Sequence, residues 1–369
     1  MNLSSQYIYV NYFCILLLFI VVWYNRRFIF RNYSRGGSGY VLLWGVLTFF
    51  SVFYIPFEGD SYNTMYTYYE YIRSGEEYHL EQIYFWLMEV LPNNYFIWRF
   101  VVWGIASYFT VLTFKKLKCE SQLATLVFIS CTLITCFYYL RNCLGLSILY
   151  YVTASIATYE FKEIKSLLFD VIEYVTLIWF TYYLHNSMPL YYCVVLIAWI
   201  LPSNAYFVLP LALLWPFMVS QLPVVGDFLL NTLFTAEAQE LSERYFEITE
   251  IDEFNFNGLM FRFLWLFPYA FIMAAGVISL KSMKESEKKI VKVFLFSAII
   301  LFSSSFILND QVSYSLQNRL LNTSFLPLSF FIVKYLEKRR TQIKCLIFSI
   351  LILFYYLLQS SQWLFKLLG

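Results

Sequence analysis

The chain has 369 residues, of which 60% are hydrophobic, 22% aromatic and only 14% charged, and its formal net charge is +2. Soluble domains are about half apolar and about a quarter charged, so this composition excludes an ordinary soluble protein. The small net charge, without a basic tract, argues against a nucleic-acid partner. The apolar residues come in runs of about 20, the length that a helix needs to cross a bilayer core. We therefore predict an all-α, polytopic integral membrane protein that forms a single membrane domain over residues 1–369.

The apolar runs predict about 12 transmembrane helices, at residues 6–24, 38–55, 95–114, 122–140, 142–159, 166–184, 188–201, 205–219, 258–280, 291–308, 318–336 and 345–364. The first run is followed by arginines and by no small-residue cleavage site, so we expect it to be retained. The runs at 188–201 and 205–219 are short. They either cross the membrane twice or form a re-entrant pair, which would leave about 10 crossings.

Lysine and arginine predict the orientation, because cytoplasmic connections carry an excess of both. Most of the 26 basic residues fall in one set of connections, at residues 25–37, 115–121, 160–165, 281–290 and 334–344, which we predict to be cytoplasmic. Both termini are then outside. The outer side holds two sizeable loops, 56–94 and 220–257, with most of the acidic residues. Short helices are expected in them at 62–73, 80–91 and 224–241, and any chemistry is expected at this face.

Four arginines oppose the charge bias, since they lie at the outer ends of predicted spans: Arg99, Arg141, Arg262 and Arg319. At mid-membrane an arginine costs about 2.5–3.5 kcal/mol, and less at the rim, where the side chain reaches water. Each of them could pair with a carboxylate or a lipid headgroup. Four together favour a shared anionic ligand, because the guanidinium binds phosphate oxygens in pairs. A polyprenyl diphosphate fits this description.

Arg141 is the strongest of the four. It follows Tyr138 and Tyr139, and Gly145 lies on the same helical face, where it leaves room for a bulky head group. Arg319 begins the eleventh span with amide side chains around it. Arg99 and Arg262 have no distinctive neighbours.

Three residues are candidate catalytic bases. His185 lies in the very short outer turn between the sixth and seventh spans, Asp60 follows the second span, and Glu81 opens a short helix. Each could deprotonate an acceptor hydroxyl, and each could equally be an ordinary polar residue at the interface or in a loop. The other histidine, His79, is expected to be exposed.

No metal or cofactor is expected. The sequence has no HExxH or DxD spacing, no GxxxxGK[ST] motif and no CxxC pair among its seven cysteines, most of which lie inside apolar runs.

The order of these motifs resembles the EpsG/Wzy-type bacterial polysaccharide polymerases. The resemblance rests on Asp60-x-Tyr62-xxx-Tyr66, on Glu81-Gln82-Ile83-Tyr84, on Arg141 with Leu144-Gly145-Leu146-Ser147, on His185-Asn186-Ser187 and on Arg319-Leu320-Leu321. Together they extend over most of the chain.

The resemblance implies a glycosyltransferase at the outer face of the bacterial cytoplasmic membrane. It would transfer a polyprenyl-diphosphate-linked glycan to the non-reducing end of a lipid-linked repeat unit, in the synthesis of O-antigen, capsule or exopolysaccharide. Arg141 and Arg319 would stabilise the leaving diphosphate. A flippase and a chain-length regulator would be further partners.

Two alternatives stay open. A lipid-linked oligosaccharide flippase or other transporter would also bind diphosphate with arginines, but the large outer loops and nearly uncharged mid-span positions favour the polymerase. A membrane glycosyltransferase that uses a polyprenyl-phosphate sugar would carry paired acidic residues in an early outer loop, and Glu58 with Asp60 resembles such a pair.

Overall fold

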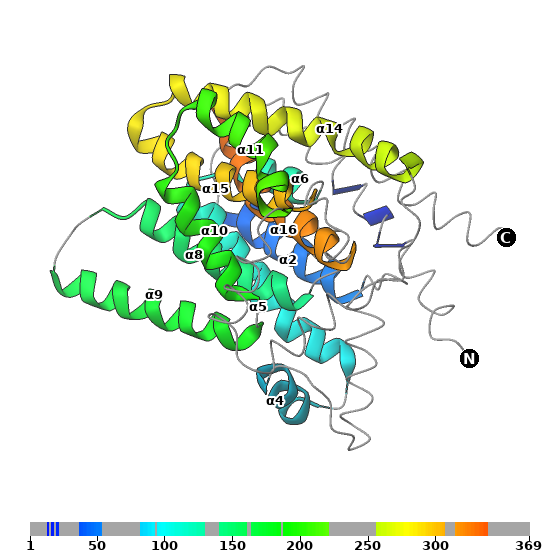
Figure 1. The fold of residues 1–369 in the computed structure, drawn as a ribbon. Helices are drawn as coiled ribbons and strands as arrows, with labels where there is room; N and C mark the ends of the chain where they lie inside the picture. The colour runs from blue at the N-terminus through cyan, green and yellow to red at the C-terminus, as the bar shows by residue number, and fades with distance from the viewer. Residues whose placement is uncertain are drawn as a thin grey trace. The chain divides into compact units, whose positions relative to one another are not determined.

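The computed structural model describes residues 13–14, 16–17, 20–21, 37–53, 82–92, 94–129, 140–160, 164–185, 187–220, 256–306 and 314–338. These residues are helical apart from short turns, and no strand occurs among them (Figure 1). The predicted all-α class is therefore confirmed for this part of the chain. Its helices are α2 (Gly37–Phe53), α4 (Gln82–Val90), α5 (Tyr95–Lys116), α6 (Ser121–Phe128), α8 (Leu140–Ala157), α9 (Ile164–Leu184), α10 (Met188–Ile200), α11 (Ala205–Ser220), α14 (Phe256–Ser279), η3 (Leu280–Ser282), α15 (Glu285–Ser304) and α16 (Tyr314–Lys338).

Most of these helices coincide with the apolar runs of the sequence. The helix predicted at 80–91 corresponds to α4, and α6 covers the first part of the run at 122–140. Helix α15 begins before its apolar run, because Glu285 and Glu287 in its first turn suit the positive end of the helix dipole. Several predictions lie outside the described residues: most of the run at 6–24, the run at 345–364, the helices at 62–73 and 224–241, and most of the two outer loops.

Two described segments are long and apolar enough to cross a bilayer, Tyr95–Lys116 and Leu167–Leu184. Five shorter helical segments are also apolar: Gly39–Phe53, Asn142–Ala157, Met188–Ile200, Ala205–Pro216 and Tyr269–Ser282. The two long segments suggest an association with membranes. The count of about 12 crossings stays a prediction.

The contacts between Cα atoms divide the chain into two compact units, residues 1–151 with 329–369, and residues 152–328. Each unit has its own buried apolar side chains, such as Leu43 and Phe114 in the first and Met188 and Phe294 in the second. The single membrane domain over residues 1–369 stays a prediction.

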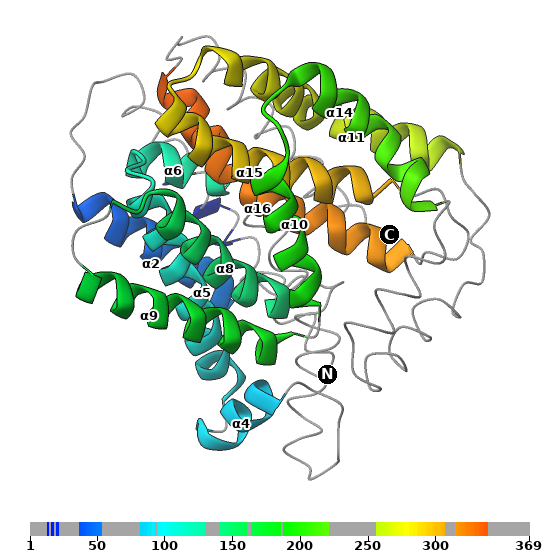
Figure 2. The same cartoon turned by 60° about the vertical axis from the view of Figure 1, so that its left-hand side comes forward.

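In the first unit, α2 packs along α5 (Figures 1 and 2). Trp44 Nε1 donates to the carbonyl oxygen of Gly104 at 3.1 Å, which joins the two helices. Further along α5, the buried hydroxyls of Thr110 and Ser147 lie 3.2 Å apart and join α5 to α8. Small and hydroxyl-bearing residues are typical of contacts between membrane helices. Residues 144–147, which contribute to the family resemblance, therefore contribute to helix packing.

Helix α4 is held on α5 by aromatic side chains. Tyr84, the last residue of the motif at 81–84, is fully buried, and its ring centroid lies 6.1 Å from that of the buried Trp98. Such edge contacts stabilise aromatic pairs by about 0.5–1.5 kcal/mol beyond their burial. Tyr84 thus has a structural role in this motif.

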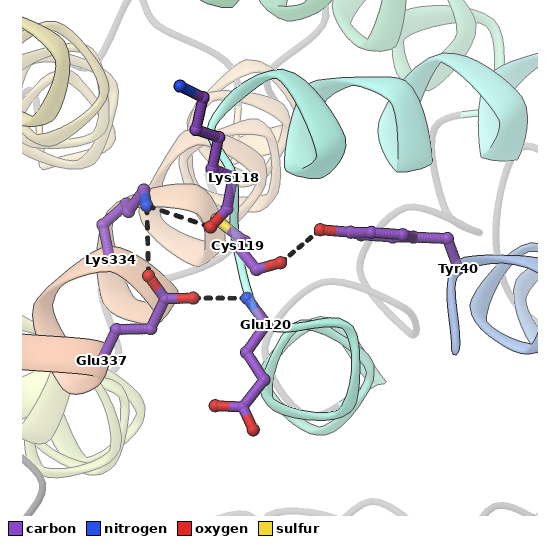
Figure 3. A network of polar contacts seen from close by, with 6 residues as sticks. All are labelled: Tyr40, Lys118, Cys119, Glu120, Lys334 and Glu337. Carbon is purple, nitrogen blue, oxygen red and sulfur yellow. Dashed lines mark hydrogen bonds and ion pairs between the residues drawn. The ribbon is translucent and has the colours of Figure 1, made fainter. Parts of the chain in front are cut away.

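A polar network fixes the turn between α5 and α6 against the end of α16 (Figure 3). Lys334 Nζ lies 3.1 Å from Glu337 Oε2 and donates to the carbonyl oxygen of Lys118 at 3.4 Å. The other carboxylate oxygen of Glu337 accepts from the backbone N–H of Glu120, the N-cap residue of α6. A carboxylate at this position satisfies a backbone donor at the helix end and suits the helix dipole. The turn has the left-handed φ of 54° at Lys118, so these contacts hold a conformation that lysine rarely adopts.

Helix α2 approaches the same turn through a glycine. The hydroxyl of Tyr40 donates to the carbonyl oxygen of Cys119 (Figure 3), and Gly39 lies against Ser121 at the start of α6. A Cβ atom on Gly39 would overlap Ser121 Oγ and lie 2.9 Å from Ser121 Cβ. The close contact between α2 and α6 therefore requires glycine at this position.

Replacing Gly39 with alanine is expected to destabilise the protein by about 1–3 kcal/mol, because the added methyl group overpacks this contact. Gly45 is the matched control, since it lies in the same helix and a Cβ atom added there would meet no neighbour within 4 Å. Gly45→Ala should be neutral or stabilising by up to about 1 kcal/mol, because alanine favours the helix. Thermal unfolding of the two variants in detergent, followed by size-exclusion chromatography, measures the difference. Equal melting temperatures would contradict the assigned contact.

In the second unit, α10 and α11 both pack against α15 (Figure 2). Helix α10 ends at Ile200 with Leu201 as its C-cap, and Lys292 Nζ of α15 donates there to the carbonyl oxygens of Trp199 at 2.7 Å and Leu201 at 2.8 Å. An ammonium group at this end satisfies carbonyl groups that lack helical partners and suits the negative end of the dipole. Asn204 Oδ1 accepts from the backbone N–H of Tyr206 at the start of α11. Both ends of the break at 201–204 are thus capped.

The lengths of α10 and α11 bear on the re-entrant alternative. Their 13 and 16 residues correspond to about 20 and 24 Å of helix, less than the roughly 30 Å of a bilayer core. Pro210 and Pro216 lie within α11, which further limits a long continuous span. The lengths favour the re-entrant pair, which stays a prediction.

Candidate functional site

The turn between α9 and α10 places His185 close to the start of α10. Helix α9 ends at Leu184, and α10 begins at Met188 with a proline in its first turn, where a missing backbone N–H costs nothing. The backbone N–H of Met188 donates to the carbonyl oxygen of His185 at 3.0 Å, which closes the turn. The His185 side chain is only 8% exposed. The turn therefore holds the imidazole within the protein and does not leave it as a solvated surface group.

Ser187 contacts the imidazole ring of His185 twice. Its backbone N–H donates to His185 Nδ1 at 3.0 Å, and its hydroxyl oxygen lies 2.7 Å from the same nitrogen. Two contacts to one ring nitrogen, both from a residue two positions on, fix the orientation of the ring.

Tyr191 connects this turn to α16. Tyr191 is buried, its hydroxyl makes side-chain hydrogen bonds with Ser187 and Thr323, and the charge of Arg319 acts on it. The hydroxyl of Thr323 lies 2.8 Å from the carbonyl oxygen of Arg319 and donates to it.

We call His185, Ser187, Tyr191, Arg319 and Thr323 the His185–Arg319 cluster. All five residues belong to the second unit. Arg319 as a whole residue is partly buried, and its Nε atom is buried. An arginine, an imidazole and several hydroxyls together form a set of hydrogen-bond donors suited to phosphate oxygens. The structure thus connects two candidate residues, His185 and Arg319, that the sequence could only name separately.

Two members of the cluster, Tyr191 and Thr323, were not predicted from the sequence. The spacing in the sequence could have indicated both, since Tyr191 lies four residues after Ser187 and Thr323 four residues after Arg319. Residues four apart share a helix face. Each follows a candidate polar residue by one helical turn.

Arg99 is the largest buried charged side chain among the described residues, with 0% exposure. Its guanidinium donates to the carbonyl oxygen of Ser51 and to the hydroxyl of Tyr95 at 3.4 Å, and it lies over the Tyr95 ring at 5.6 Å. Ser51 is in the last turn of α2, where carbonyl groups lack helical partners. These contacts give Arg99 a structural role at the end of α2. Its role in diphosphate binding stays a prediction.

The side chains of the four remaining candidates lie outside the described part of the chain. Arg141 is the second residue of α8 and Arg262 lies in the second turn of α14, but both side chains are outside the described part. Asp60 and Glu81 lie outside the described residues altogether. Their predicted roles stay predictions. Gly145, on the helical face of Arg141, is buried.

Among the described residues, no three His, Cys, Asp or Glu side chains lie close enough together to hold a metal ion. Comparisons with family models, curated proteins and solved structures gave no match for this chain.

Proposed function

We propose that this chain is a polytopic membrane glycosyltransferase whose site binds the diphosphate of a lipid-linked glycan. Within that class, we infer a polymerase of glycan repeat units, as in the EpsG/Wzy-type polymerases that the sequence resembles. The main support is the His185–Arg319 cluster, because it joins two of the motifs on which the resemblance rests. A partly exposed arginine beside buried hydrogen-bond donors is suited to an anionic ligand.

The surface of α9 supports the membrane setting. Only 11% of the residues in its apolar segment, Leu167–Leu184, are buried. Phe169 is 74% exposed and Trp179 62%. A core helix of a soluble protein would bury such side chains, whereas acyl chains would cover them without cost. This exposure supports a position of α9 at a lipid surface. The proposal takes the protein as a multi-pass protein of the bacterial cytoplasmic membrane with the site facing outward, as the charge bias predicts.

In the proposed reaction, a hydroxyl oxygen at the non-reducing end of the acceptor repeat bonds to the anomeric carbon of the donor glycan. The bond between that carbon and the diphosphate oxygen breaks, and polyprenyl diphosphate leaves with an additional negative charge. Arg319 stabilises this charge, with Arg141 as the expected second cation. The hydroxyl proton passes to a base, for which Asp60 and Glu81 are candidate carboxylates.

Deletion of the gene tests this function. The deletion strain is expected to display surface glycan with one repeat per anchor on a gel, and a plasmid copy should restore long chains. Complete loss of the glycan would instead indicate a flippase, and a repeat unit lacking one sugar would indicate the glycosyltransferase that uses a polyprenyl-phosphate sugar. An unchanged chain length would contradict all three functions.

Tyr191→Phe is expected to reduce glycan extension about tenfold, because the cluster loses the hydroxyl that joins Ser187 to Thr323, an effect of about 1–1.5 kcal/mol. Tyr192→Phe is the matched control. The Tyr192 hydroxyl donates to the carbonyl oxygen of Ile178 at 3.0 Å and contacts Thr181, so it joins α10 to α9 outside the cluster. Chain-length distributions on gels, normalised to the amount of protein in membranes, compare the variants. Equal effects of both substitutions would indicate general destabilisation and not a role in the site.

A further inference from the structure

The contacts of His185 determine which ring nitrogen carries its proton. A neutral imidazole has one N–H donor and one acceptor nitrogen, and the hydrogen bond at one nitrogen sets the role of the other. The backbone N–H of Ser187 donates to Nδ1 at 3.0 Å. A backbone amide cannot accept a hydrogen bond at its nitrogen, so Nδ1 is the acceptor and the proton is on Nε2. The Ser187 hydroxyl, 2.7 Å from Nδ1, is then a second donor to the same nitrogen.

We propose that His185 is a fixed Nε2–H hydrogen-bond donor, and that it binds an oxygen of the diphosphate and is not the base that deprotonates the acceptor hydroxyl. The binding of a diphosphate oxygen rests on the proposed function, whereas the position of the proton on Nε2 depends on the turn geometry alone.

A general base and a hydrogen-bond donor require different protonation of the imidazole ring. A general base needs an unprotonated nitrogen within reach of the substrate hydroxyl. In His185 the unprotonated nitrogen is engaged by Ser187, a residue of the same turn, and the other nitrogen carries a proton. Hydrogen-bond donors that the fold holds in place are the usual means by which the charge of such a leaving group is stabilised. His185 therefore belongs with Arg319, to which Ser187 and Tyr191 connect it, and the role of base falls to Asp60 or Glu81.

The tautomer can be measured directly, because the chain has only two histidines. The protein carrying His79→Gln is labelled with ¹⁵N-histidine, purified through an affinity tag without histidine and placed in lipid bilayers. Solid-state NMR then reports on His185 alone. At neutral pH we expect a proton bonded to Nε2 and an unprotonated, strongly deshielded Nδ1. A proton on Nδ1, or an exchanging mixture of both tautomers, would overturn the inference.

Two substitutions test the role of the donor. In glutamine, the side-chain amide places an N–H close to the position of Nε2–H, but it cannot accept a proton. His185→Gln should therefore retain glycan extension within about tenfold of the unsubstituted protein, whereas His185→Ala should reduce it about 100-fold, as the loss of one oriented donor does in other sites. His79→Gln is the control and should extend glycan normally. If His185→Gln were as inactive as His185→Ala, while present in membranes at normal amounts, His185 would be the base and the proposal would be wrong.

The two experiments separate this inference from the proposed function. If gene deletion left the chain length of the glycan unchanged, the polymerase function would fail, and the NMR result would still decide the tautomer. If deletion did stop polymerisation but His185→Ala had no effect, the function would stand and the role of His185 would be refuted.

Discussion

Arg319→Ala is expected to leave the protein folded and inserted, while glycan extension falls about 1000-fold and cells accumulate single lipid-linked repeats. Arg319 is only partly buried, so its truncation leaves a smaller cavity than that of a core side chain. The loss of a charge that stabilises the leaving diphosphate, however, costs about 4 kcal/mol of transition-state stabilisation, which corresponds to the expected factor. Gel analysis of surface glycan and mass spectrometry of extracted lipid-linked glycan measure both effects.

Two further substitutions sharpen this test. Arg319→Lys keeps the charge but loses the planar pair of donors, so it should restore only a small part of the activity. Lys288→Ala is the matched control for the loss of a cation in the same unit. Lys288 forms an exposed ion pair with Glu285 at 3.1 Å, and such pairs contribute about 0–1 kcal/mol. Arg319→Ala with normal chain lengths would refute the assigned role of the cluster.

Arg99→Ala is expected to have the opposite effect, a loss of folded protein. The side chain is fully buried and satisfies the Ser51 carbonyl and the Tyr95 hydroxyl. Its truncation leaves a cavity and removes the partner of buried polar groups, which together cost about 3–5 kcal/mol. This is a large fraction of the stability of a typical protein. The amount of monodisperse protein after solubilisation, and its melting temperature, should both fall.

Phe100→Ala provides the control for Arg99. Phe100 follows Arg99 in α5 but is 50% exposed, so its truncation should cost much less. If Arg99→Ala were as stable as Phe100→Ala and lacked only glycan extension, Arg99 would belong to the diphosphate site, as the charge bias of the sequence suggests. The contrast between Arg99 and Arg319 thus distinguishes a structural arginine from a ligand-binding one.

The positions of the helices follow from the sequence more fully than the contacts between them. Apolar runs and their interruptions predict α5, α9 and α10 closely, because the backbone must satisfy its hydrogen bonds within each span. The break at 201–204 is visible in the sequence as a proline and an asparagine. The role of Lys292 at that break is not, since it depends on α15 packing beside the end of α10.

The residues of the candidate site are likewise only partly predictable from the sequence. His185 and Arg319 are recognisable because a histidine in a short turn and an arginine against the charge bias are unusual for a membrane protein. Tyr191 is an ordinary aromatic residue near a predicted interface, and Thr323 an ordinary small residue in a span. Their importance comes from a contact between α10 and α16, which lie far apart in the sequence. Likewise, Arg99 has no distinctive neighbours in the sequence, and its partner Ser51 is on another helix.

The most direct test of the proposed polymerase uses purified components. Lipid-linked repeat unit, extracted from the deletion strain, is incubated with the purified protein in liposomes without nucleotide sugars and in the presence of a chelator. We expect mass spectrometry to show lipid-linked glycans of two and more repeats, with one polyprenyl diphosphate released for each new linkage, and neither product with Arg319→Ala. Recovery of the single repeat unchanged from the unsubstituted protein would contradict the proposal.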